Sequence, residues 1–328
     1  MRTSMSTAAH ALSRRRVLLA LGALAGVNLA FAQGYPSRPV RLIVPAPAGT
    51  SPDVMARAWG EAFARATGQP VVVENKPGAS TMIAAQAVAG APADGYTLLY
   101  TFNNTFSINP WVFRKMPYKA DDFTPISRIL SVPYVLLVSS DSRIRSLQQL
   151  VAEARAHPGT LNYASAGIAS GFHVVMERLL NAAGVKMTHV PYKDSFLTDL
   201  MGQRVDVAFD ASTGAIAQVR AGKLRALAVS SARRIEALPE VPAIAETYPG
   251  FVGDSSHGLF APRGTPAAVV AALEAQTQRI VAAAEFQASL REVSLTPVGS
   301  SAEQFRQFLA ADAQAWGQVV RDNGIRLD

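Results

Sequence analysis

Residues 40–53 read VRLIVPAPAGTSPD, and this stretch predicts a strand, a loop and the start of a helix. The run Val40–Val44 is apolar and largely β-branched, which favours a buried strand. Ser51 suits a helix N-cap, and Pro52 suits the first helical position. Asp53 is favourable near the positive end of the helix dipole. The strand should therefore deliver the chain, through a short loop, to a helix that begins near residue 51.

The same alternation of strand and helix continues along the chain. Apolar residues recur at three- and four-residue spacing over 51–67, which predicts one amphipathic helix that Gly68 ends. Further short β-rich runs predict strands at 71–73, 97–100, 135–138, 161–163, 205–209, 225–229 and 258–260. Longer helical patterns include 82–89, 172–181, 267–284 and 302–323. This order predicts an α/β fold with largely parallel sheets.

The 328 residues are enough for two medium domains, each with its own core. Turn-rich stretches near 139–146 and 249–257 are the places where the chain would cross between them. These crossings predict a discontinuous first domain, 33–138 plus 251–328, and an inserted second domain, 139–250.

The first 32 residues have the pattern of an export signal. Arg14, Arg15 and Arg16 precede an apolar stretch that ends in the small-x-small pattern 30–32, and that stretch is too short to span a bilayer. The signal fits either the Sec or the twin-arginine route. We therefore expect a periplasmic mature chain from Gln33, with no stable membrane insertion.

Composition excludes several classes of function. The net charge is +7, but four positive charges lie in the first 32 residues, which leaves +3 on the remainder and predicts no nucleic-acid partner. The chain has no cysteine, which excludes disulfides, thiolate metal sites and a cysteine nucleophile.

Searches for catalytic and metal motifs favour neither class. The sequence has no Gly-x-Ser-x-Gly elbow, phosphate-binding loop or dinucleotide fingerprint, and we expect no cofactor. His173 and Glu177 are four apart, as metal ligands on a helix can be, but a surface or capping pair is more common, and we expect no metal. Ser165 or Ser170 with His173 and Asp210 leaves a secreted hydrolase as an alternative.

Three loops rich in glycine and hydroxyl residues each separate a predicted strand from a predicted helix: 45–53, 77–81 and 164–171. Such loops expose backbone N–H groups at helix N-termini, where anions bind without arginine or lysine. In α/β sheets these loops meet at the carboxyl ends of the strands. Because they occur in both predicted domains, we expect one anionic ligand in the cleft between them.

Ordered motifs along 35–328 are similar to a known family. They are 35–45 (YPSRPVRLIVP), 69–79 (QPVVVENKPGA), 94–99 (DGYTLL), 161–167 (LNYASAG), 189–193 (HVPYK), 221–229 (AGKLRALAV) and 258–262 (GLFAP). Together they resemble the Bug-type extracytoplasmic solute receptors of tripartite tricarboxylate transporters.

The resemblance implies a two-lobed periplasmic-binding-protein fold, type II-like, in which each lobe is a mostly parallel sheet flanked by helices. It implies a monomer without catalysis that captures a small mono- or dicarboxylic acid, aromatic ones included. The acid would pass to the transporter's membrane subunits, or its presence would be signalled through a histidine kinase. The implied ligand-binding residues are Ala48, Gly49, Thr50, Ser51, Asp53, Gly78, Ala79, Ser80, Thr81, Ser165, Ala166, Gly167, Ser170, His173 and Asp210.

Several positions depart from the family pattern, and specificity should lie there. Met82, Ile168 and Phe196 would fit an apolar ligand body, or else belong to the core. His257 is expected either to donate to a second carboxylate or to lie on the rim. The sequence therefore assigns no particular acid.

Overall fold

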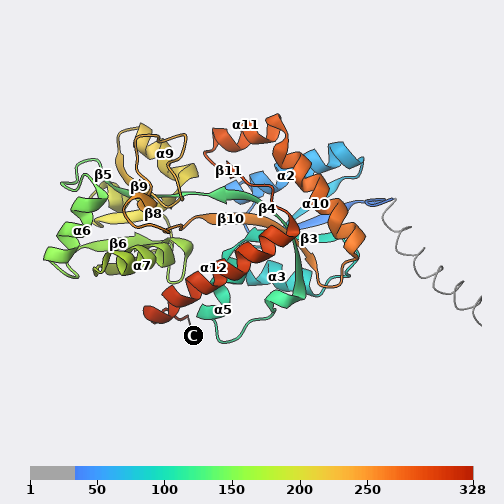
Figure 1. Ribbon diagram of the computed structural model, residues 1–328, viewed down its shortest axis with the longest axis horizontal. Coiled ribbons are helices and arrows are strands. Elements are labelled where there is room, and N and C mark those ends of the chain that lie inside the picture. The colour runs from blue at the N-terminus through green and yellow to red at the C-terminus, as the bar shows by residue number, and fades with distance from the viewer. Residues whose placement is uncertain (1–33, 328) are drawn as a thin grey trace, which may run out of the picture.

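The computed structural model describes residues 34–327, so the predicted signal peptide lies outside the described residues. These residues form two β-sheets flanked by helices, placed side by side along the long axis of the molecule (Figure 1). We call the part built on the first sheet the first lobe, and the part built on the second sheet the second lobe.

The first sheet has six strands in the order β11-β4-β10-β3-β1-β2. Their bounds are β1 Val40–Val44, β2 Val71–Asn75, β3 Thr97–Phe102, β4 Phe123–Val132, β10 Ser255–Pro262 and β11 Thr296–Pro297. Strand β1 is parallel to β2 and β3, whereas β10 is antiparallel to β3 and β4. Because β1, β2 and β3 run the same way, the loops that follow them leave the same edge of the sheet.

The second sheet has five strands in the order β7-β6-β8-β5-β9. Their bounds are β5 Tyr134–Ser139, β6 Asn162–Ser165, β7 Thr188–Pro191, β8 Val207–Ala211 and β9 Leu224–Val229. Strand β6 is parallel to β7 and β8, and β5 is antiparallel to β8 and β9.

The α/β fold with two sheets flanked by helices is confirmed: four of the six strands in the first sheet and four of the five in the second run in the same direction. Each sheet contains an antiparallel strand at a crossing point: β10 in the first and β5 in the second. A strand that enters a sheet from the other lobe runs against the strands joined by right-handed βα units, so the sheet becomes mixed.

The first crossing of the chain between the lobes lies earlier than the boundary predicted at residue 139. Only Pro133 separates β4 from β5, and the whole of β5 pairs within the second sheet. On the return, the N–H of Gly253 still bonds to Ser230 of the second lobe, and β10 begins at residue 255. The prediction missed β4 because its polar residues, including Ser127 and Arg128, mask the apolar alternation.

Helices cover both sheets. Their bounds are α2 Ser51–Thr67, α3 Met82–Ala89, α4 Asn104–Ser107, α5 Asn109–Val112, α6 Leu147–Ala156, α7 Gly171–Ala183, α8 Leu197–Met201, α9 Ser212–Arg220, α10 Ala267–Ala282, α11 Ala284–Glu292 and α12 Ala302–Asp322. Helix α2 buries Trp59 and Phe63, whose rings stack 5.0 Å apart in the first-lobe core. It ends at Gly68, which is left-handed as a C-cap requires. Among the described residues, the structure contains no helix long and apolar enough to cross a bilayer.

Helix α12 connects the two lobes. It runs across the front of the molecule from the first lobe to the second (Figure 1). Its buried residues Trp316, Val319 and Val320 belong to one apolar cluster with Val174 and Val175 of α7. The C-terminal helix therefore packs against both lobes.

Candidate functional site

A cavity of about 460 Å³ lies between the lobes. The first lobe and α12 contribute Ser51, Pro52, Phe102, Asn103, Asn104, Ile108, Val132, Ser255, His257 and Trp316. The second lobe and the segment that leads out of it to β10 contribute Tyr134, Ala166, Gly171, Phe172, Ala211, Thr213, Gly253 and Asp254. A volume of this size is typical of small-molecule sites. The wall is mainly apolar and aromatic, with polar groups at a few positions, which suits a small organic molecule with a polar end group.

His257 is buried in the cavity wall. Its Nδ1 lies 2.9 Å from the hydroxyl of Tyr100, and its ring packs edge-on against Phe102. Burial lowers the pKa of His257 to about 3, so the ring is neutral at physiological pH. It can exchange one further hydrogen bond with a ligand through Nε2 but supplies no positive charge. The expected rim position of His257 is wrong, because only 4% of the residue is exposed, and its donation to a second carboxylate stays a prediction.

The first loop reaches the cavity at Ser51, while Asp53 is directed into the protein. The carboxylate of Asp53 accepts hydrogen bonds from the N–H of Gly49 (2.8 Å), from Arg57 (3.0 Å) and from Asn75 (2.8 Å). The bond from Arg57, with those from Asn75 and Gly49, lowers the pKa of Asp53 to about 2. Only 2 % of Asp53 is exposed, so we read it as a residue that fixes the loop 48–50.

The second loop is strained. Residues 78–81 all have positive φ, and three of them are not glycine. Such a run costs on the order of 1 kcal/mol per non-glycine residue and persists only where the surroundings impose it. Here Asn109 donates to the carbonyl oxygen of Ser80 (2.7 Å), and the hydroxyl of buried Thr81 lies 2.8 Å from that of Thr105. Residues 78–81 do not contribute to the cavity wall.

The third loop meets the cavity at Ala166, but its serines have other partners. The hydroxyl of Ser165 donates to the carbonyl oxygen of Gly167 (3.0 Å), so the 2.7 Å contact with Nε2 of His189 has the imidazole as donor. Ser165 is fully buried. The hydroxyl of Ser170 caps α7 by accepting the N–H of His173 (3.3 Å).

His173 holds the third loop from within the second lobe. Its Nδ1 accepts the N–H of Ala169 (3.0 Å), and its ring stacks on that of His189 with centroids 3.9 Å apart. Burial, with His189 nearby, lowers the pKa of His173 to about 3. Within residues 34–327, no bond joins the ring of His173 to Ser165 or Ser170, so the predicted Ser/His/Asp set is not assembled.

Asp210 directly precedes Ala211, which lines the cavity, but Asp210 itself is not part of the wall. Its carboxylate accepts the N–H of Ala211 (2.9 Å), and burial raises the pKa of Asp210 to about 6. The neighbouring Ala211 and Thr213 do face the cavity. In the described part of the chain, no group of three or more histidine and carboxylate residues is placed to hold a metal ion.

Sequence reasoning missed most of the cavity wall. Asn103 and Asn104 follow β3, which is parallel to β1, so the edge rule applied to the first two loops would also have found them. No local pattern indicated Trp316, because it comes from the last helix. Of the three apolar residues considered for a ligand body, Phe196 is a core residue, and neither Met82 nor Ile168 contributes to the wall.

Comparison with known proteins gives a consistent result. Residues 54–325 match the model of the tripartite tricarboxylate transporter family receptor. The chain is 35% identical over 94% of its length to a UPF0065 protein from the tcbD-tcbE intergenic region of Pseudomonas sp. strain P51, covering 94% of that protein. It is 34% identical over 90% of its length to Protein BugT of Bordetella pertussis, covering 92% of it. These findings confirm the predicted resemblance.

Solved structures of relatives have the same fold. The R. palustris protein Rpa4515 with adipate is 34% identical, with a TM-score of 0.78 over 89% of this chain and 100% of that one. The periplasmic binding protein BugD is 31% identical, with a TM-score of 0.74 over 89% of this chain and 100% of BugD. MatC from Rhodopseudomonas palustris with bound malate is 30% identical, with a TM-score of 0.73 over 87% and 100%.

Proposed function

The chain belongs to the tripartite tricarboxylate transporter receptor family, and from this premise we propose that it captures a small carboxylate between its lobes and delivers it to the membrane subunits of such a transporter. Members of this family are solute-binding receptors and not enzymes. The observation that carries the proposal is the cavity of about 460 Å³ whose wall comes from both lobes. A ligand there contacts both lobes at once, so its binding favours one lobe arrangement over others.

The polar groups of the wall support an acid as the ligand. Ser51 begins α2 with backbone N–H groups that have no partner within the helix, and the positive end of the helix dipole favours an anion there. Neutral His257 supplies a hydrogen bond without a full positive charge, and the amide of Asn104 lies in the same wall, whereas that of Asn103 already bonds to Asp312, Ser255 and Ser256. Two relatives were solved with the dicarboxylates adipate and malate, which supports the same class of ligand.

The proposal includes export. Residues 1–32 carry the predicted signal, and a cleft that loads a solute for a membrane transporter is useful outside the cytoplasm. We therefore propose a periplasmic location for the mature chain.

A ligand screen tests the proposal. Thermal denaturation is followed with adipate, malate and benzoate, and with the neutral diamide adipamide as the matched control. At about a hundredfold excess over Kd, a bound acid adds about 2.7 kcal/mol to the free energy of unfolding, which raises Tm by several degrees. Titration calorimetry then gives the affinity for the acid that stabilises most.

Two variants locate the site. Ala166→Leu places a larger side chain into the cavity from an exposed loop, and we expect it to abolish the ligand-induced shift in Tm. Ala182→Leu, at the exposed far end of α7, should keep the shift. Equal stabilisation by adipamide and adipate would refute recognition of a carboxylate. Equal ligand shifts in the two variants would refute this cavity as the site.

An ester assay separates the receptor from the hydrolase. We expect no turnover of acyl esters, because Ser165 is buried and its hydroxyl donates to Gly167. Turnover that disappears in Ser165→Ala would instead support the hydrolase.

A further inference from the structure

A second hollow of about 790 Å³ lies on the other side of the segment 252–254, which returns the chain to the first lobe. We call it the arginine groove. One wall is the loop 231–237 of the second lobe together with Arg220 at the end of α9. The opposite wall is 291–298 of the first lobe, which contains β11. The groove therefore spans both lobes, as the ligand cavity does.

The lining of the groove is strongly basic. Five arginines face it, namely Arg128, Arg220, Arg233, Arg234 and Arg291, against two acids, Glu236 and Asp254. Among residues 34–327, Arg220, Arg233 and Arg291 form no ion pair within the chain. All three are exposed. Three unpaired guanidinium groups around one hollow leave a positive potential that an acidic partner can neutralise.

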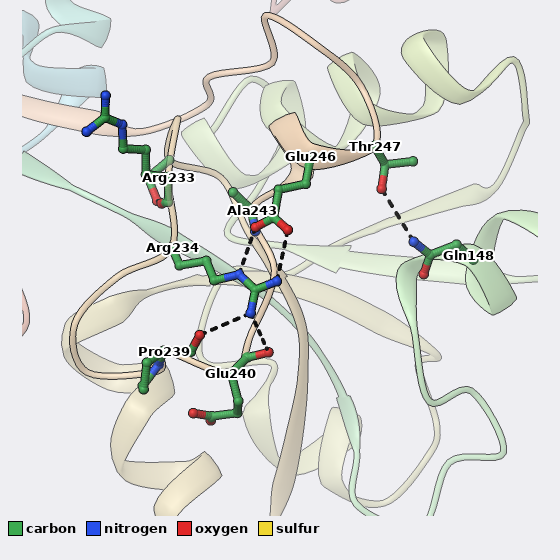
Figure 2. Close-up of polar contacts among 9 residues, drawn as sticks. Gln148, Arg233, Arg234, Pro239, Glu240, Ala243, Glu246 and Thr247 are labelled. Carbon is green, nitrogen blue, oxygen red and sulfur yellow. Dashed lines mark hydrogen bonds and ion pairs between the residues drawn. The ribbon is translucent and has the colours of Figure 1, made fainter.

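The loop wall is held rigidly by the fourth arginine. Arg234 forms two hydrogen bonds to the carboxylate of Glu246 (2.8 and 2.9 Å) and donates to the carbonyl oxygen of Pro239 (3.2 Å). Figure 2 shows this network, and it shows the guanidinium of Arg233 extending away from it. Arg234 thus fixes the loop, while the neighbouring Arg233 stays available to a partner.

The groove also has an apolar component. Val252 and Val298 are 40% and 38% exposed and face it, next to half-buried Ile235 and Pro297. A small inorganic anion makes no use of such a surface. A peptide segment that alternates acidic and apolar side chains would use both the arginines and the valines.

The connecting segment 252–254, just before β10, separates the groove from the ligand cavity. Val252 faces the groove, Gly253 faces the cavity and Asp254 borders both. The carboxylate of Asp254 accepts hydrogen bonds from Ser230 of the second lobe (2.5 Å) and Ser131 of the first (3.0 Å). Because both hollows are lined by both lobes, a movement of one lobe relative to the other changes the shape of the cavity and the width of the groove together.

We propose that the arginine groove is the docking site for an acidic segment of the transporter's membrane subunits on the periplasmic side. This inference rests on the proposed function, because it names the surface through which delivery occurs. Charge complementarity selects the acidic segment, and the concave shape disfavours a flat bilayer surface. Because the groove spans both lobes, the segment can discriminate between lobe arrangements and hence between loaded and empty receptor.

The first test is direct binding. A fluorescein-labelled peptide of alternating glutamate and leucine is titrated with the mature protein, and its anisotropy is recorded at low and high salt. We expect binding that weakens with salt, because the contacts are screened ion pairs. The groove variant carries Arg220→Glu, Arg233→Glu and Arg291→Glu. The control variant carries Arg145→Glu, Arg279→Glu and Arg326→Glu, three exposed arginines elsewhere with the same change in net charge.

We expect the groove variant to lose about tenfold in peptide affinity, which corresponds to about 1.4 kcal/mol, and the control variant to lose little. Equal losses in both variants would overturn the proposal in favour of unspecific charge. Displacement of the peptide by inorganic phosphate at similar concentration would overturn it in favour of a small-anion site. Groove-dependent binding to phosphatidylglycerol vesicles without peptide binding would overturn it in favour of a membrane surface.

The second test is uptake into proteoliposomes that hold the cognate membrane subunits. We expect the groove variant to bind the carboxylate with unchanged affinity but to lose most of its uptake, while the control variant keeps both. Unchanged uptake in the groove variant would overturn the docking site and leave the receptor function standing. Absence of carboxylate binding in the wild-type protein would refute the receptor function itself, so the two failures are distinguishable.

Discussion

Ser212 of the second lobe donates a hydrogen bond of 2.8 Å to the carbonyl oxygen of Ser294 of the first lobe. Ser212 is fully buried, and its N–H donates to the carbonyl oxygen of Pro133, the residue at the first crossing. Its neighbours Ala211 and Thr213 face the ligand cavity. The two lobes are thus connected by a polar contact directly beside the candidate site.

Removing this contact should weaken ligand binding. Ser212→Ala loses one buried hydrogen bond, whose net contribution is about 0.5–1.5 kcal/mol, and the arrangement with the lobes in contact becomes less populated. We expect Kd for the carboxylate to rise by roughly two- to tenfold in titration calorimetry. Ser289→Ala is the control, because the hydroxyl of Ser289 donates to Phe286 within α11 alone. Unchanged affinity in Ser212→Ala would show that the contact has no part in closure.

Asp53 should make the stability of the first lobe depend on acidic pH. Its folded pKa of about 2 lies below the ordinary value near 4, so its contribution is complete above pH 4 and is lost as pH falls toward 2. We expect Asp53→Asn to lower the free energy of unfolding by about 1–3 kcal/mol at pH 7 and to reduce this acid dependence. Urea denaturation between pH 7 and 2.5 measures both effects. Asp121→Asn, at an exposed position, should match the wild type; equal profiles for all three proteins would contradict the role of Asp53.

Asp210 should have the opposite effect. Its folded pKa of about 6 lies above the ordinary value, so the folded state retains a proton that the unfolded chain has released, and stability falls as pH rises from about 4 to about 6. Asp210→Asn cannot ionise and can still accept the N–H of Ala211. We therefore expect it to raise the free energy of unfolding at pH 7 by an amount on the order of 1 kcal/mol, with a higher Tm. At pH 4 we expect an unchanged Tm. A variant less stable than the wild type at pH 7 would show that the ionised carboxylate is favourable in the fold.

Glycine substitutions should detect the backbone strain in the second loop through their effect on Tm. Ser80 is left-handed at φ 49°, where glycine has no steric cost. Ser80→Gly relieves strain in the folded state, and this gain offsets the greater conformational entropy of the unfolded chain. Ala87 is exposed in α3, where glycine costs about 1 kcal/mol. We expect an unchanged Tm for Ser80→Gly and a lower one for Ala87→Gly. A similar decrease in both would argue against strain at Ser80.

Much of the fold follows from local sequence. The strand at 40–44 and the helix at 51–67 form with the predicted bounds, because apolar periodicity, the proline at the start and Gly68 at the end all act within a few residues. The predicted helix over 267–284 instead breaks at Ala283, where extended backbone separates α10 from α11. The sequence at that point contains no proline or glycine that would predict the break.

The candidate site could be predicted only in part. The edge at which it lies follows from strand direction, and Ser51, Ala166 and His257 do line the cavity. Asp53 and His173 have the residue types that a ligand site needs, yet each already accepts a hydrogen bond from its own loop. Asp53 accepts the N–H of Gly49, and His173 accepts the N–H of Ala169. Sequence gives the residue type after a strand but not which way its side chain turns.

By itself, the sequence determined the strand and helix segments, the family and the three loops that follow strands, because each of these depends on residues close together in the chain. Only the tertiary structure decided that Pro133 is the crossing, that Trp316 of the last helix closes the cavity, and that arginines from both lobes share one groove. These features depend on contacts between positions distant in the chain, and they arise when the burial of apolar surface brings the two lobes together.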